Sequence, residues 1–264
     1  MLANVFAKTI REQRRALVWW AIGLVAACLV TTAFYPSIRE NAASFQRLLH
    51  SLPEGLRKAF GEDFASPAGY LQARLFSIFA PVLFLIFAIG AGSRAIAGEE
   101  EHKTLDLLLS TPVPRRRVLL DKAFAMLAAT VGLGLVLALA ITVSGPPFEI
   151  AVSTANIAAA VADCVLLATA FGAIALAVGA GTGRRSVAIG LTAGLAAGSY
   201  LIDVLALSVD GLGWVQHLSP FFYYRSPDPI AHGLDPADAA ILAVISLVAT
   251  GIAVVAFERR DLAA

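Results

Sequence analysis

The side chains most able to do chemistry form one dense charged stretch, GEEEHKTLDLLLSTPVPRRRVLLDK, from Gly98 to Lys122. Its glutamates and its histidine are of types that can bind a metal ion. His102, however, has no second His or Cys at ligand spacing, so the sequence predicts no metal site here. The stretch lies between two long apolar runs, and it needs another explanation.

The usual enzyme motifs are missing from the sequence. It contains no GxxxxGK[ST] loop for ATP, no HExxH zinc motif and no GxSxG nucleophile elbow. Its four histidines are scattered through the connections between apolar runs. We therefore expect a chain that is not itself an enzyme, with no catalytic residue and no cofactor or metal of its own.

Asp163 and Asp203 are further candidates, because each interrupts an otherwise uncharged apolar run. A charged group inside a membrane is costly and usually marks a function. Asp163 could line a substrate path, pair with a neighbouring helix, or be hydrated near the outer interface. A proton-coupled carrier would need a chain of polar groups through the membrane, and two aspartates are few for such a chain, which counts against that class of protein.

Composition indicates that the chain crosses a membrane. Of its 264 residues, 58% are hydrophobic and 15% are charged, and the mean hydropathy is +0.77. Soluble domains average about 25% charged residues. A formal net charge of +1 gives no electrostatic case for a nucleic-acid partner. Since about 20 apolar residues span the hydrocarbon core as a helix, we predict a single all-α transmembrane domain over residues 1–264. Its six expected spans cover residues 16–38, 71–97, 118–144, 154–181, 186–209 and 238–257.

Basic residues give the expected orientation, because Lys and Arg collect in cytoplasmic loops. Of the 20 Lys and Arg residues, 14 fall on the side that holds both termini and the charged stretch. The other six fall on the opposite side, and all but one of these lie in or beside one long loop after the first span. We therefore expect a multi-pass protein with both termini in the cytoplasm.

Three connections carry patterns of their own. Residues 2–17 place apolar side chains near one helical face and basic ones elsewhere, which predicts an interfacial helix on the inner leaflet. Residues 45–52 repeat phenylalanine and leucine at helical spacing, which predicts a short amphipathic helix on the outer surface. In the last outer connection, Phe221, Phe222 and Tyr223 fit either an interfacial aromatic belt or a short re-entrant segment.

In this topology the charged stretch lies in the cytoplasm between the second and third spans. Negative charge at Glu99–Glu101 is favoured at a helix N-terminus, and Leu105 and Leu108 share one helical face. A proline then ends the helix, and three arginines begin the next span. The sequence thus predicts a short amphipathic cytoplasmic helix that either covers the end of the helix bundle or binds a cytoplasmic partner.

The same segment resembles the one after the second span in ABC-2 type permeases, which are membrane subunits of ATP-binding-cassette exporters. The shared order is a glycine, an acidic run, a Thr-Leu-(Asp/Glu)-Leu-Leu core and then Ser-x-Pro-(Val/Leu)-x-Arg. Here these parts are Gly98, Glu99–Glu101, Thr104–Leu109, Ser110 and Pro112–Arg115. The rest of the chain agrees with that family in outline only.

The resemblance implies a half-size permease that pairs with a second permease chain, identical or paralogous. It also implies separate ATPase subunits, which bind ATP and Mg. In that family the helix matching Glu99–Ser110 is a coupling helix that docks into the ATPase, and the loop matching Thr182–Ser186 lies near the same partner. The implied ATPase contacts in the coupling helix are Glu99, Glu100, Glu101, Lys103, Leu105, Asp106, Leu108 and Leu109, and those in the loop are Arg184 and Arg185. The residues expected to line a substrate path are Asp163, Asp203, Phe221, Phe222 and Tyr223.

The resemblance further implies export of a hydrophobic or amphipathic compound, such as a drug, an antibiotic or a lipid. The driving force would be ATP hydrolysis on the partner, and the location the cytoplasmic membrane of a prokaryote. Three alternatives stay open at this point: a same-fold membrane subunit of a copper-enzyme maturation system, a proton-coupled secondary carrier, and an anchor or sensor that transports nothing.

Overall fold

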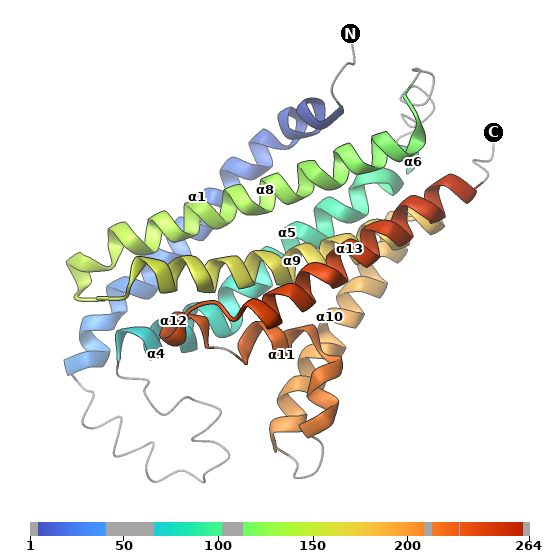
Figure 1. Ribbon diagram of the computed structural model, residues 1–264. Helices are drawn as coiled ribbons and strands as arrows, with labels where there is room; N and C mark the ends of the chain where they lie inside the picture. The colour runs from blue at the N-terminus through green and yellow to red at the C-terminus, as the bar shows by residue number, and fades with distance from the viewer. Residues whose placement is uncertain (1–4, 41–65, 102–112, 209–212, 227, 261–264) are drawn as a thin grey trace.

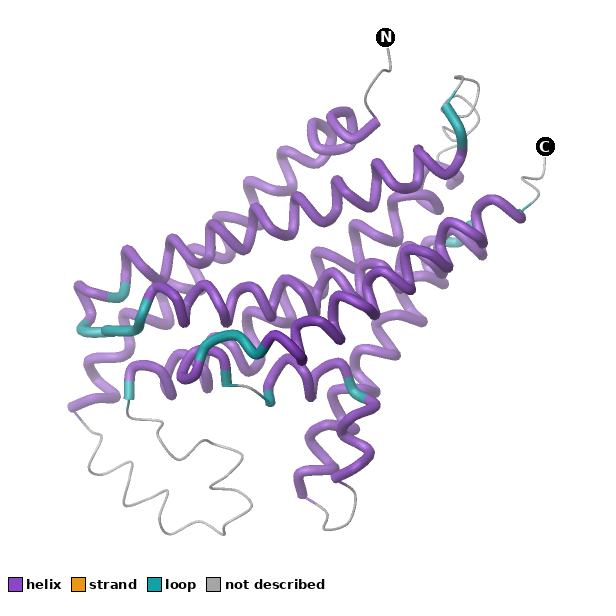
Figure 2. The backbone as a smooth tube through the Cα atoms, viewed as in Figure 1, coloured by secondary structure: helices purple, strands orange, loops and turns teal. Residues whose placement is uncertain are grey.

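The computed structural model describes residues 5–40, 66–101, 113–208, 213–226 and 228–260. Every regular element in that part of the chain is a helix, and six helices are long and apolar enough to cross a membrane (Figures 1 and 2). This confirms the expected all-α class with six membrane-capable helices. A hydrocarbon environment requires such a fold, because each backbone amide must be hydrogen-bonded within its own segment.

Five of the six spans are single helices and the second is composite. The single helices are α1 (Val5–Glu40), α8 (Arg115–Ser144), α9 (Thr154–Thr182), α10 (Arg185–Ser208) and α13 (Pro236–Arg259). The composite span joins α4 (Pro67–Leu71), the π-helix η1 (Gln72–Phe79), α5 (Ala80–Ser93), the π-helix η2 (Arg94–Gly98) and α6 (Glu99–Glu101). Four short elements connect spans: η3 (Pro146–Phe148), η4 (Gly213–Leu218), α11 (Pro220–Arg225) and α12 (Pro229–His232).

The first span differs from the expected arrangement, because no break separates an interfacial helix from the span. α1 is continuous over 36 residues, about 54 Å at 1.5 Å per residue, which exceeds the roughly 30 Å of a hydrocarbon core. No Gly or Pro interrupts residues 5–22, so nothing in the sequence ends the helix there. Its first turn packs Val5 against Val118 of α8, which extends the contact between these helices beyond the length of a span.

α9 is the central helix of the bundle, in contact with α5, α8, α10 and α13 (Figure 1). Small residues let the composite second span approach it closely, as is common between membrane helices. A Cβ atom on Gly92 would overlap the carbonyl oxygen of Gly172, and a Cβ on Gly172 would lie 2.8 Å from the sulfur of Met126. The backbones of α5 and α9 therefore touch at this crossing.

The spans share two ends, which we name for use below. The terminal face holds the described residues nearest both termini, with α6, the starts of α8 and α10, and the ends of α9 and α13 (Figure 1). The opposite face holds α4, η3, η4, α11 and α12. The candidate residues divide between these two faces.

Candidate functional site

The three consecutive glutamates lie on the terminal face, and each contacts a different helix. Glu99 pairs with a residue of α8, Glu100 with the residue after α13, and Glu101 with the first residue of α10. We call Glu99–Glu101 and these partners the glutamate cluster. Through it, the end of the second span is tied to three other spans at once.

The contact between Glu99 and Lys122 is the most buried of the three. Lys122 Nζ donates to Glu99 Oε1 at 2.6 Å, and the side chains are only 5% and 15% exposed, the lysine being the more buried. An ammonium group at such a depth is tolerated when a carboxylate compensates its charge. Glu99 at the end of the second span therefore supplies the hydrogen-bonded counter-charge for Lys122 inside α8.

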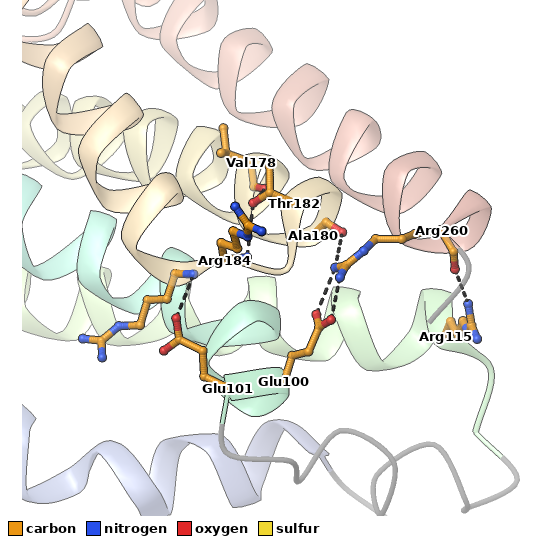
Figure 3. A network of polar contacts seen from close by, with 9 residues as sticks. Glu100, Glu101, Arg115, Val178, Ala180, Thr182, Arg184 and Arg260 are labelled. Carbon is orange, nitrogen blue, oxygen red and sulfur yellow. Dashed lines mark hydrogen bonds and ion pairs between the residues drawn. The ribbon is translucent and has the colours of Figure 1, made fainter. Parts of the chain in front are cut away.

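Arg260 joins several helix ends, as Figure 3 shows. Its Nη1 donates to Glu100 Oε2 at 2.9 Å and to the Ala180 carbonyl at 3.4 Å, and its Nη2 donates to the other Glu100 oxygen. Its own carbonyl accepts from Arg115 Nη1 at 3.0 Å. The guanidinium occupies the space that a Cβ on Gly183 would fill, and Gly183 ends α9 with φ +66°. Only glycine suits both the backbone and the close approach there.

The short turn between α9 and α10 completes the cluster (Figure 3). Glu101 Oε1 accepts the backbone N–H of Arg185 at 3.1 Å. The backbone N–H of Arg184 donates to Thr182 Oγ1 at 3.3 Å, and Arg184 is exposed. This turn, expected from the sequence as a second contact for the ATPase, thus lies beside the end of the second span.

The remaining residues of the expected coupling helix lie in residues 102–112, outside the described part of the chain; they are Lys103, Leu105, Asp106, Leu108 and Leu109. What the structure gives is the point from which that segment leaves the bundle. At this point the carboxylates of Glu99, Glu100 and Glu101 are bound to groups of the same chain. Intramolecular contacts therefore fix the base of the segment.

The second group of candidate residues gathers around α11 on the opposite face. Asp203 of α10 is 1% exposed, and Arg225 at the end of α11 donates to both of its oxygens at 3.0 and 3.1 Å. A forked pair of this kind compensates the buried carboxylate. Asp203 therefore holds α11 against α10 in this conformation.

The aromatic residues of α11 differ in what they contact. Phe221 is buried, with ring centroids 5.9 Å from Phe171 of α9 and 5.4 Å from Tyr200 of α10. Tyr223 donates its hydroxyl to the His217 carbonyl at 2.8 Å, and the ring of Phe222 lies 5.3 Å from that of Tyr223 and 4.5 Å from that of His217. One side of α11 thus packs on the spans and the other on η4.

Asp163 lies deeper, in α9. It is 1% exposed, and neither of its oxygens has a hydrogen-bond partner among the described residues. The next residue, Cys164, is fully buried, and Tyr224 of α11 donates its hydroxyl to the Phe76 carbonyl at 2.6 Å. Asp163 interacts electrostatically with Tyr224, so α11 links it to the other candidates.

Sequence reasoning missed the basic partners, although a signal was available. A carboxylate that falls inside an apolar run needs a cation on the same side of the membrane. Arg225 is the lone basic residue of the last outer connection, which makes it the natural partner of Asp203. Lys122 lies inside the third apolar run, so by the same reasoning it needs an acidic partner on its side of the membrane. The acidic run Glu99–Glu101 contains that partner, Glu99.

The forked contact gives a first prediction: Arg225→Met should lower the free energy of unfolding by about 1–2 kcal/mol. The variant leaves Asp203 buried without its cation, and the figure is discounted because the Arg225 side chain is 38% exposed and partly solvated. Arg225→Lys keeps the positive charge but cannot donate to both carboxylate oxygens in the same way. Its free energy of unfolding should therefore lie between those of wild type and Arg225→Met. Chemical denaturation in mixed micelles measures all three, and equal midpoints for wild type and Arg225→Met would contradict the role of this pair.

Comparison with known proteins places the chain in a family. The sequence matches the family described as "ABC-2 family transporter protein" over residues 3–262, nearly its whole length. No curated protein matches it. The match extends far beyond the charged stretch that first suggested it, and six membrane-capable helices agree with it. The chain therefore belongs to the ABC-2 transporter family, as a multi-pass membrane permease subunit that works with an ATPase subunit of the ABC class.

Proposed function

We propose that this permease subunit exports a hydrophobic or amphipathic compound and that ATP hydrolysis on the separate ATPase subunit drives the export. The observation that carries the proposal is the glutamate cluster. It fixes the base of residues 102–112 to α8, to α10 and to the residue after α13. A force applied to that segment by a partner would therefore act on several spans together.

The terminal face is the cytoplasmic face in this proposal. It carries Arg115, Arg184 and Arg260, along with most other basic residues of the chain, as the positive-inside rule requires. ATP and Mg bind the ATPase subunit on that side, and a second permease chain, identical or paralogous, completes the transporter. The membrane is the inner membrane of a prokaryote.

A groove between α1 and the composite second span supports the substrate class. It has a volume of about 560 Å³ and is lined mostly by aliphatic and aromatic side chains, with the hydroxyl side chain of Thr31 and one cationic group, Arg74. Val30 and Phe34 of α1 line it, together with Tyr70 of α4. An apolar body with an anionic or polar end matches this lining. None of the five residues expected from the sequence to form the substrate path lines this groove.

Leu108→Asp tests the proposal. A charged group on the apolar face of a docking helix should reduce recovery of the ATPase with the tagged permease at least about tenfold, equivalent to roughly 1.4 kcal/mol. Efflux of a fluorescent amphiphile from cells should fall in parallel, while membrane insertion stays unchanged. Leu105→Asp should behave in the same way.

Leu218→Asp is the matched control. Leu218 lies in η4 on the opposite face and is 71% exposed, so the same change there should leave recovery of the ATPase intact. If Leu108→Asp retains the ATPase and the efflux of wild type, docking through residues 102–112 is wrong.

A further inference from the structure

Asp163 is set apart from the other acidic side chains of the structure. Among the described residues, it is the carboxylate with both oxygens buried and both without a hydrogen-bond partner. It lies nine residues into α9, about 14 Å along the helix from its start, and is 1% exposed. An ionised carboxylate in that setting is strongly disfavoured, because no group of the described residues donates a hydrogen bond to it.

The groups around Asp163 favour its neutral form. The charged groups that act on it electrostatically are both acidic: Asp235, the N-cap of α13, and Asp238 in the first turn of α13. Asp163 in turn acts on Tyr224 of α11 and on Cys164 of α9. None of these groups is a cation. The nearest candidate in the described part of α11, Arg225, is bound to Asp203.

We propose that Asp163 is a proton-binding site: it holds a proton in this conformation and releases it when the start of α13 moves away from α9. Asp235, which caps α13 by accepting the N–H of Ala237 at 2.8 Å, places negative charge at the end of the helix that would move. Opening at the opposite face is thus linked to proton release, a property beyond the proposed export function and independent of which compound is moved.

Because proton release from Asp163 is linked to opening, the fraction of open protein depends on pH in one direction. If Asp163 ionises only in the open conformation, raising the pH pulls the protein toward that conformation. The ratio of open to closed protein then rises by up to about tenfold for each pH unit in the range where the two conformations differ in protonation. Asp163→Asn, which cannot ionise, removes this dependence.

Infrared spectroscopy of the full chain in lipid nanodiscs tests the proton directly. Wild type at neutral pH should show the carbonyl-stretch band of a protonated carboxylic acid, and this band should disappear in Asp163→Asn. Asp235→Asn and Asp238→Asn are matched controls that should keep it. If Asp163→Asn does not fold, Asp163→Glu serves instead, because the band must then move. A wild-type spectrum without the band, or a band unchanged by substitution at Asp163, overturns the proposal.

Cys164 offers a second readout, because it is fully buried beside Asp163. Its alkylation by a maleimide reports opening. Each rate is divided by the thiolate fraction of Cys164 measured in the same variant, because Asp163 acts electrostatically on that thiol, and the corrected rates of wild type and Asp163→Asn are then compared as a ratio. This ratio should rise with pH by up to about tenfold per unit. Cys28, also buried but in α1, reports general unfolding and should show no such rise. A ratio that stays flat with pH overturns the link between proton release and opening.

Discussion

Replacing Glu99 with glutamine is expected to lower the free energy of unfolding by about 3 kcal/mol, because it removes the carboxylate that is hydrogen-bonded to the buried Lys122 ammonium. The lysine side chain is 5% exposed, and its Nζ lies 2.6 Å from Glu99 Oε1. Breaking a buried pair by removing one partner typically costs about 3–5 kcal/mol, and we take the lower end because Glu99 is partly exposed. Equilibrium denaturation of the purified chain in mixed micelles measures the change.

Two further variants identify the cause. Glu99→Gln combined with Lys122→Met removes both charges and should recover most of the loss, since apolar replacement of a whole buried pair is often neutral. Glu101→Gln is the matched control, because Glu101 is exposed and its carboxylate accepts the backbone N–H of Arg185; its effect should stay within about 1 kcal/mol. Equal losses for Glu99→Gln and Glu101→Gln would show that burial of Lys122 does not set the stability.

Gly92→Ala is expected to have a comparable effect through packing alone. The added methyl group would overlap the carbonyl oxygen of Gly172, so α5 and α9 must separate or shift. Overpacking of this kind costs about 1–3 kcal/mol, and the upper end applies because the obstructing atom belongs to a helix backbone that cannot rotate away. The melting temperature in nanodiscs should fall accordingly.

Gly90→Ala controls for helix propensity on the same helix. A Cβ there meets only Arg94 Nη2, at 3.9 Å, so the change should be neutral or stabilise by up to about 1 kcal/mol. Comparing the two alanine variants removes the intrinsic preference for alanine over glycine. If both variants melt together, the close crossing of Gly92 and Gly172 does not limit the packing of α5 on α9.

The sequence predicted some features of the site and missed others for a consistent reason. It predicted Glu99–Glu101 as contacts for a partner protein and Asp203 as part of a substrate path, which stay predictions, but it did not identify the groups that bind these side chains within the chain. The structure shows Asp203 bound to Arg225 and the glutamates bound within the chain. Their partners were not evident because pairing depends on which helix ends meet, and local periodicity does not contain that information.

The sequence by itself determined the class of fold and the family. Six apolar runs of bilayer length leave a helix as the available conformation for each, because lipid offers no partner to an unpaired amide. An ordered local motif then suggested the family, and the match over residues 3–262 confirmed it. Both conclusions need only residues that are close in the chain.

The tertiary structure alone decided how the charges are compensated. Glu100 and Arg260 are 160 residues apart, Glu101 and Arg185 are 84 apart, and Asp163 is left with no partner among the described residues. In a low-dielectric interior, such contacts set whether a charge is stable, ionised or neutral. They depend on the order in which the spans pack around α9, and that order follows from small residues at helix crossings, which hydropathy does not distinguish from other apolar residues.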